Sequence, residues 1–130
     1  MIMLDSNICI YIINKRPPRV LERFRQYRAG ELALSSIVAS ELAFGVEKRR
    51  SDRHVAALEL FLLPFEILPF DERCVWHYAR IRAGLESKGR VIGAMDTLIA
   101  AHALALDVPI ATNHVKEFAR VPGLKVQHWV

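Results

Sequence analysis

Short runs rich in apolar residues alternate along this sequence with longer stretches in which apolar residues recur at helical spacing. We predict strands at these short runs, which lie at 2–4, 32–34, 66–68, 108–111 and 124–126, and the first of them is wholly apolar. Runs of this length are typical of strands buried on both faces of a sheet. Strands that alternate with helices form a parallel sheet, because each connection must cross over the sheet to return to the same end. The sequence therefore predicts an α/β fold, with a central parallel sheet of about four to five short strands flanked by helices on both faces.

The stretches between these runs predict helices whose ends are marked by prolines, glycines and small polar residues. We expect helices over 6–14, 18–28, 37–50, 52–62, 71–88 and 95–106, and a short helix within 112–118. Ser6 and Asn7 can cap the first of these helices, and Asp71 can cap the fifth. The segment 95–106 is apolar on nearly every side, which predicts a central helix buried by its neighbours.

Length and composition limit the class of protein. The 130 residues suffice for a single domain, which we assign to 1–130, and 52% hydrophobic with 25% charged residues excludes a disordered chain. The longest apolar runs are far shorter than the roughly 20 residues that span a bilayer, and Met1–Leu4 lacks the basic flank of a signal peptide. We therefore expect a cytoplasmic protein without membrane contact. Cys9 and Cys74 lack the spacing of metal ligands and are expected to be buried thiols.

The basic residues of the chain are clustered. Lysine and arginine outnumber aspartate and glutamate by 18 to 14, which gives a net charge of +4. The clusters lie at 15–28, 48–53 and 80–90. Such clusters occur as solvated helix faces that keep a domain soluble, and also as tracks that contact the phosphates of a nucleic acid. The composition alone is compatible with both.

Three acids adjoin buried apolar segments. Asp5 follows the first strand and Asp96 opens the most apolar helix, so each could simply cap a helix. Glu41 lies on the apolar stripe of the helix 37–50, where an unpaired carboxylate is costly, and an arginine could neutralise it. The carboxyl ends of parallel strands meet at one edge of a sheet, and acids gathered there repel one another unless a cation joins them. Such a donor set without His or Cys suits Mg²⁺ or Mn²⁺.

The five histidines do not form a competing site. His102 falls on the apolar face of the helix 95–106 and is expected to be a hydrogen-bonded core residue, whereas His114 follows a strand and could touch the acidic edge. The sequence contains no GxSxG, P-loop, GxGxxG or HExxH motif. The common serine hydrolases, NTPases, Rossmann proteins and zinc proteases are thereby excluded.

Four motifs, in order and over nearly the whole length, resemble those of the PIN-domain ribonucleases, and in particular the VapC-type toxins of bacterial toxin–antitoxin pairs. They are Leu4-Asp5-Ser6-Asn7, then Leu34-Ser35-Ser36-Ile37 with Ser40-Glu41-Leu42-Ala43-Phe44-Gly45, then the segment 92–103 around Asp96, and finally Thr112-Asn113-His114-Val115-Lys116-Glu117-Phe118. Each motif alone is weakly specific. Their order and spacing together make the resemblance strong.

The resemblance implies a metal-dependent endoribonuclease in which Asp5, Glu41 and Asp96 are catalytic acids that bind Mg²⁺ or Mn²⁺. It implies cleavage of RNA, such as structured tRNA, to products with 5′-phosphate and 3′-hydroxyl ends. It also implies a homodimer that is blocked by a small VapB-like antitoxin, and the pair contacts its operator DNA only through the antitoxin.

The chain departs from the family pattern at His114, where many members carry a fourth acid. A second metal would then need help from Asn113 or Glu117. The supporting residues of the expected active site are Ser6, Asn7, Thr112, Asn113, His114 and Glu117. Arg82 and Arg90, which precede the Asp96 loop, are predicted to contact RNA phosphates, although both could be solvated charges.

Two other classes of function are alternatives to a nuclease. A dehalogenase-like phosphatase would need a second Asp where Asn7 stands, and a receiver domain would need an adjacent pair of acids that the sequence lacks. A non-catalytic PIN-like module that binds RNA or protein would keep the sheet and the arginines. Such a module has no reason to hold Glu41 on an apolar stripe.

Overall fold

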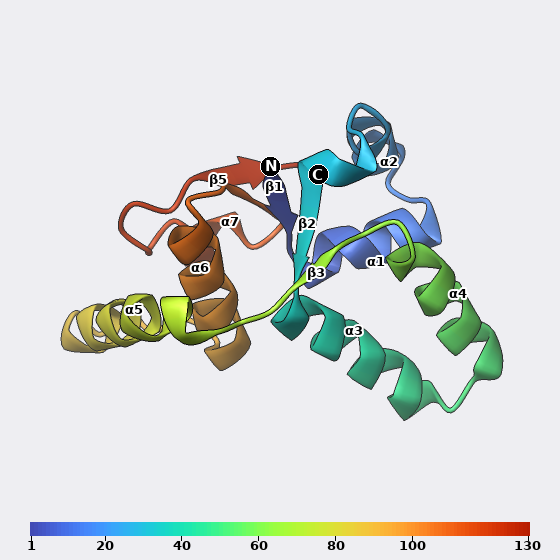
Figure 1. The fold of residues 1–130 in the computed structure, drawn as a ribbon. Helices are drawn as coiled ribbons and strands as arrows, with labels where there is room; N and C mark the ends of the chain where they lie inside the picture. Colours follow the sequence, from blue (N-terminus) through green and yellow to red (C-terminus); the bar gives the residue numbers. More distant parts are fainter.

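The computed structural model describes all 130 residues and contains a five-stranded parallel sheet of order β3-β2-β1-β4-β5 (Figure 1). All four neighbouring pairs of strands are parallel. The strands are β1 (Ile2–Leu4), β2 (Leu32–Ser35), β3 (Ile67–Leu68), β4 (Ile110–Thr112) and β5 (Val126–His128). The expected α/β fold with a central parallel sheet is confirmed.

Seven α-helices and two 3₁₀ turns connect the strands. The helices are α1 (Ser6–Asn14), α2 (Pro18–Arg25), α3 (Ser36–Arg49), α4 (Asp52–Leu62), α5 (Val75–Ser87), α6 (Ala94–Leu106) and α7 (Val115–Phe118). The 3₁₀ turns are η1 (Ala29–Glu31) and η2 (Glu72–Cys74). None of these helices has the length and apolar character that a membrane crossing requires.

The order of the strands decides which face each helix covers. The connections from β1 to β2 and from β2 to β3 step in one direction along the sheet, and their right-handed crossovers carry α1 to α4 over one face. The return from β3 to β4 runs in the opposite direction, so α5 and α6 cover the other face, as Figure 1 shows. The reversal falls between β1 and β4, and the loops at the carboxyl ends of these two strands therefore diverge. A crevice at such a point is where α/β sheets bind ligands.

The core lies around the central strands and α6. Met3 and Leu4 on β1 and Ile110 on β4 are fully buried. Ala100 and Ala101 are fully buried on α6, and their small side chains let this helix pack closely on the sheet. Both Cys9 and Cys74 are buried free thiols, as expected. Burial, together with the charge of Asp5, raises the pKa of the Cys9 thiol, so that it stays protonated.

Several element boundaries differ from the prediction. The last strand was expected at 124–126 but forms at Val126–His128, because only there does the chain pair with β4 after the turn at Gly123. The helix expected over 18–28 ends at Arg25, and the Glu31 carboxylate accepts the Arg28 N–H at 2.9 Å to begin η1. The helix expected over 71–88 begins as η2, capped by Asp71, before α5.

Candidate active site at the carboxyl ends of the strands

Asp5 links β1 to α1 and is 1% exposed. It is the N-cap of α1, because its Oδ1 accepts a hydrogen bond from the Ser6 N–H at 2.8 Å. Its Oδ2 accepts a hydrogen bond from the Thr112 hydroxyl at 2.7 Å. The capping expectation for Asp5 is thus confirmed, whereas Ser6 and Asn7, which were expected to cap α1, lie inside the helix. Two hydrogen bonds fix the orientation of this buried carboxylate.

The end of β4 supplies a second group of polar side chains. Thr112 is fully buried, and its Oγ1 accepts the backbone N–H of His114 at 2.9 Å. The His114 ring lies between α1 and α6: its Nε2 is 2.7 Å from Asn7 Nδ2, and its Nδ1 is 3.7 Å from Asp96 Oδ2. His114 therefore lies at the acidic edge, as the sequence suggested for it.

Asp96 lies in the first turn of α6 but does not cap it. The N-cap is Gly93, and no side chain caps this helix end. The interpretation of Asp96 as a helix cap is therefore wrong, and its carboxylate faces the other polar groups. Single ligand atoms of Asp5, Asp96 and His114 all lie within 4.8 Å of one another, a spacing that one metal ion can bridge.

Glu41 on α3 faces the same cluster without a cationic partner. Its Oε1 atom is buried and has no hydrogen-bond partner, and no arginine or lysine forms an ion pair with it. The alternative of an arginine salt bridge to Glu41 is therefore wrong. Burial raises the pKa of Glu41, and the charges of Asp5 and Asp96 raise it further, while the Ser6 side chain and His114 lower it.

Asp96 has the same electrostatic character. Burial raises its pKa, the charge of Asp5 adds to the effect, and the charge of Glu117 contributes as well. His114 acts in the opposite direction. The acids therefore repel one another within this crevice, as expected if the site is built for a cation.

Asn113 forms a side-chain hydrogen bond to α1 and none to the acids. Its Nδ2 donates a hydrogen bond to the Tyr11 hydroxyl at 3.0 Å, which ties the loop after β4 to α1. Sequence reasoning missed Tyr11, because nothing in the sequence links two residues that are 102 positions apart. Glu117 on α7 contributes through its charge and does not belong to the closest group of donors.

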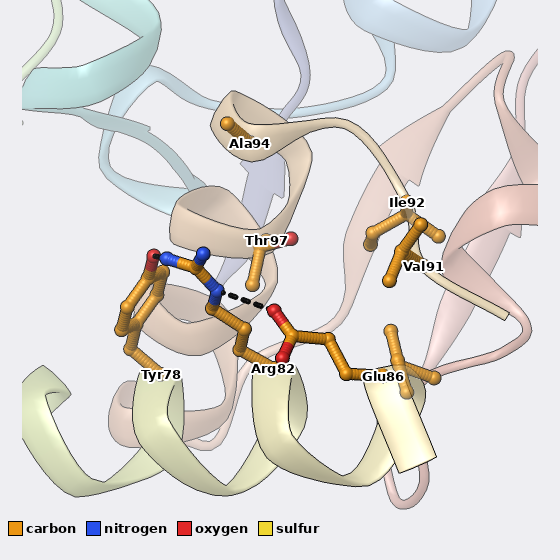
Figure 2. A pocket seen from close by; sticks show the side chains of 8 residues that line it. Tyr78, Arg82, Glu86, Val91, Ile92, Ala94 and Thr97 are labelled. Atoms are coloured by element: carbon orange, nitrogen blue, oxygen red, sulfur yellow. Dashed lines mark hydrogen bonds and ion pairs between the residues drawn. The ribbon is translucent and has the colours of Figure 1, made fainter. Parts of the chain in front are cut away.

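Arg82 lies on α5 beside a hollow of about 270 Å³ that reaches Thr97, the residue after Asp96 (Figure 2). Its Nε donates to Glu86 at 2.9 Å and its Nη1 donates to the Tyr78 hydroxyl at 3.0 Å, as the view in Figure 2 indicates. Arg90 is exposed on the loop that leads into α6. Both arginines thus lie on the elements that precede Asp96 in the chain.

The first basic cluster, at 15–28, lies elsewhere. Its helix α2 lies near the chain termini, at the end of the sheet away from the acids (Figure 1). The Arg23 guanidinium lies over the Trp129 ring, 5.6 Å from its centroid, and Tyr27 stacks on the same ring at 5.5 Å. Arg23 of this cluster therefore contributes to packing against the C-terminal segment.

A second hollow, of about 140 Å³, lies between α1, α3 and α4. Glu41 and Gly45 line it on α3, and Ile10, Ile13 and Leu58 give it apolar walls. The Cβ of an alanine at Gly45 would meet nothing within 4 Å, so this glycine keeps the hollow wide. One of the three acids, Glu41, thus lies at the side of a hollow with several apolar residues in its lining.

A family model for the PIN domain matches residues 2–124. The chain belongs to the PIN-domain family. This PIN domain is 40% identical to Ribonuclease VapC2 of Rickettsia felis over 129 residues, an alignment that covers 98% of this chain and 96% of the relative. It is 39% identical to the tRNA(fMet)-specific endonuclease VapC of Shigella flexneri, with 98% and 96% covered.

Solved structures agree with the family. The PIN domain superposes with a TM-score of 0.91 on VapBC2 from Rickettsia felis bound to a DNA fragment from their promoter, at 40% identity and with all of both chains covered. It superposes with a TM-score of 0.90 on DNA-bound VapBC from Salmonella typhimurium, at 36% identity and with 99% and 98% covered. The resemblance to VapC-type PIN domains is confirmed, and the dehalogenase-like and receiver alternatives are excluded.

Proposed function

We propose that residues 1–130 act as one nuclease domain, a metal-dependent endoribonuclease that is the toxin of a VapBC-type toxin–antitoxin pair. The observation that carries this proposal is that Asp5 and Asp96 lie together and act electrostatically on Glu41, while no lysine or arginine forms an ion pair with any of the three. The names of the relatives, Ribonuclease VapC2 and tRNA(fMet)-specific endonuclease VapC, support the same activity.

The residues of the crevice fit a divalent cation. The buried Oε1 of Glu41 has no hydrogen-bond partner. A buried carboxylate oxygen without a partner is costly, and a bound cation would remove that cost. Asp5 and Asp96 offer further oxygens, which lie within 4.8 Å of each other. Oxygen-rich donor sets suit Mg²⁺ and Mn²⁺, so we propose that Asp5, Glu41 and Asp96 hold one of these ions.

A divalent ion held by Asp5, Glu41 and Asp96 would lower the pKa of a bound water and would neutralise charge on the phosphoryl oxygens. Asp5 is a rigid donor, because the Ser6 N–H and the Thr112 hydroxyl each occupy one lone pair of its carboxylate and leave the others free to bind a cation. Asp96 and Glu41 supply the other two carboxylates of the proposed site. Asn7 and Asn113 hold the ring of His114 and the loop after β4 in place.

The proposed substrate is a structured RNA such as tRNA, and cleavage occurs in the cytoplasm. Arg82 and Arg90 lie on the elements that precede Asp96, where their guanidinium groups can contact phosphates on one side of the scissile bond. Contacts of this kind add affinity without reading sequence, so the choice of RNA depends on its shape and single-stranded loops.

A non-catalytic module that binds RNA or protein is the alternative. The environment of Glu41 argues against it, because a binding surface does not require a carboxylate that is raised in pKa by burial and by its acidic neighbours. The relatives that match over nearly the whole chain carry nuclease names.

The proposed protein partner is a small VapB-like antitoxin, and operator DNA is contacted only through it. The two solved relatives described above are VapBC complexes, and both are bound to DNA. The apolar hollow between α1, α3 and α4 opens beside Glu41, so an antitoxin segment in it would adjoin the acids. Replacing the exposed Ala57 of that hollow by arginine should weaken co-purification with the protein encoded by the adjacent reading frame, and unchanged co-purification would remove the hollow from the interface.

We also propose a homodimer. Val75 and Trp76 at the start of α5 are 52% and 68% exposed, and apolar residues of this size at a surface favour association with a second copy. Light scattering of the purified protein tests this, and a mass equal to one chain at micromolar concentration would contradict it.

The nuclease activity is tested by incubating the purified protein with initiator tRNA and with a structured control RNA, in Mg²⁺ or Mn²⁺. Cleavage with 5′-phosphate ends is expected, and EDTA should abolish it. Asp5→Asn and Asp96→Asn should each lower the rate by two orders of magnitude or more, on the order of the loss when a preorganised electrostatic group is removed.

The matched control is Asp107→Asn. Asp107 is the C-cap of α6 in a left-handed conformation that asparagine also adopts, and it lies at the far end of that helix from Asp96. Asp107→Asn should cleave at the wild-type rate. Cleavage that persists in both active-site variants, or that resists EDTA, would overturn the proposal.

A further inference from the structure

The third member of the closest donor group is an imidazole rather than a carboxylate. Ligand atoms of Asp5, Asp96 and His114 lie within 4.8 Å of one another, and the nitrogen that faces Asp96 is Nδ1, at 3.7 Å from Oδ2. Two ligands on opposite sides of an ion, each about 2.1 Å from it, are about 4.2 Å apart. Since 3.7 Å is below that limit, one ion can contact both atoms without movement of either backbone.

We infer that His114 is a direct ligand of the ion, through Nδ1, and that this mixed carboxylate–imidazole site prefers Mn²⁺ over Mg²⁺. The inference rests on the proposed function, because it concerns the ion that the nuclease uses. Mg²⁺ favours oxygen ligands, whereas imidazole nitrogen favours transition-metal ions. Replacing one carboxylate by an imidazole therefore shifts the preference of the site away from Mg²⁺.

His114 is held for this role by its backbone. Its N–H donates to Thr112 Oγ1, and the same hydroxyl donates to Asp5 Oδ2. One threonine thus positions both a carboxylate and the residue that carries the imidazole. The His114 side chain is 44% exposed, so a hydrated ion can reach it from solvent.

Asn7 controls which nitrogen of His114 is free to bind. With Asn7 Nδ2 donating to Nε2 at 2.7 Å, the ring proton lies on Nδ1, which cannot then bind a metal. Turning the Asn7 amide by half a turn exchanges its nitrogen and oxygen. Asn7 Oδ1 then accepts a hydrogen bond from Nε2–H, and the lone pair of Nδ1 faces Asp5 and Asp96. Metal-binding histidines are held in this way, with the second ring nitrogen donating to a carbonyl or carboxylate oxygen.

The inference is tested by pulsed electron paramagnetic resonance of the full-length protein with Mn²⁺ alone. Wild type should give the nitrogen modulation of a directly bound imidazole, and protein labelled with ¹⁵N-histidine should change it. His114→Asp should keep Mn²⁺ binding and lose the modulation. The matched control is His128→Ala, which removes an exposed imidazole from the same surface hollow and should retain the modulation.

Calorimetry with each metal gives a second readout. His114→Asp should lower the ratio of Mn²⁺ to Mg²⁺ affinity about tenfold or more, and Asn7→Leu should lower Mn²⁺ affinity by about 10–100-fold with the histidine in place. Mn²⁺ that binds tightly without nitrogen modulation, or with an unchanged affinity ratio in His114→Asp, would overturn the inference and leave the metal-dependent nuclease intact. Failure of wild type to bind Mn²⁺ or Mg²⁺ would overturn both.

Discussion

The Thr112 hydroxyl donates a 2.7 Å hydrogen bond to Asp5 Oδ2 and so joins the ends of two neighbouring strands, β1 and β4, between residues 107 positions apart in the chain. Both side chains are buried. The bond spans the point where the strand order reverses, and it fixes the carboxylate from which the proposed site is built.

Replacing this threonine by valine removes the hydroxyl but keeps the shape. Thr112→Val should lower the free energy of unfolding by about 1–3 kcal/mol, because buried Asp5 loses a donor and the His114 N–H loses an acceptor. RNA cleavage should fall with it, as Asp5 is no longer held. Urea denaturation and a cleavage assay measure the two effects, and Thr112→Ser, which keeps the hydroxyl, should restore most of both. If Thr112→Val unfolded with the wild-type free energy, the hydrogen bond from Thr112 to Asp5 would not contribute to stability.

A buried histidine makes stability depend on pH. His102 is fully buried with Nδ1 2.7 Å from Ser35 Oγ and its Nε2 without a partner, and burial lowers its pKa. Below the ordinary value of 6.5 the unfolded chain binds a proton that the folded chain does not, so this residue makes stability fall as pH drops below about 6.5. His102→Gln should flatten that dependence in urea denaturation between pH 5 and about 7. The exposed His128→Gln is the control, and equal slopes in wild type and His102→Gln would contradict the prediction.

Glu41 gives the opposite dependence in metal-free protein. Because its pKa is raised, the folded chain holds a proton at pH values where the unfolded chain has lost it, and stability falls as pH rises above the ordinary value of 4.5. Glu41→Gln should be less sensitive to pH over this range. Saturating Mn²⁺ should stabilise wild type more than Glu41→Gln, measured by thermal unfolding with and without EDTA. A metal-induced shift of equal size in both proteins would exclude Glu41 as a ligand.

Variants at Arg82 and Glu86 test the predicted contact of Arg82 with an RNA phosphate. The Arg82 guanidinium donates to Glu86 and to the Tyr78 hydroxyl, so Glu86→Gln should free it and tighten RNA binding. Arg82→Ala should weaken RNA binding and lower the slope of log affinity against log salt concentration by about one. Fluorescence titration at several salt concentrations measures both. Arg25→Ala on the distant α2 should change neither, and an equal effect there would mean that binding depends on net charge alone.

Two glycines should respond in opposite ways to alanine. Gly45 lies within α3 at an exposed position where an added Cβ meets nothing within 4 Å, so Gly45→Ala should stabilise the protein by about 0.5–1 kcal/mol. Gly89 has a φ of 63°, and Gly89→Ala should destabilise it by about 1 kcal/mol because the left-handed conformation strains alanine. Urea denaturation of the pair measures this, and the same sign for both would contradict it.

Local patterns were sufficient for much of the fold. The apolar run at Ile2–Leu4, the helical spacing from Ile37 and the apolar segment around Ile99 predict elements that the structure contains, because each records which faces of an element are buried. The predicted position of β5 was wrong because it depends on pairing with β4, and the predicted end of α2 was wrong because a local turn, in which the Arg28 N–H donates to Glu31, follows Arg25.

The sequence by itself determined the alternation of strands and helices, the family to which the motifs belong, and the candidate acids Asp5, Glu41 and Asp96. Only the tertiary structure decided that Asp96 faces the crevice instead of capping α6, that no arginine neutralises Glu41, and that His114 lies against Asp96 while Asn113 is held by Tyr11. The physical reason is that spacing along a chain records burial and local hydrogen bonding, whereas the partner of a polar side chain depends on which strand ends the sheet brings together.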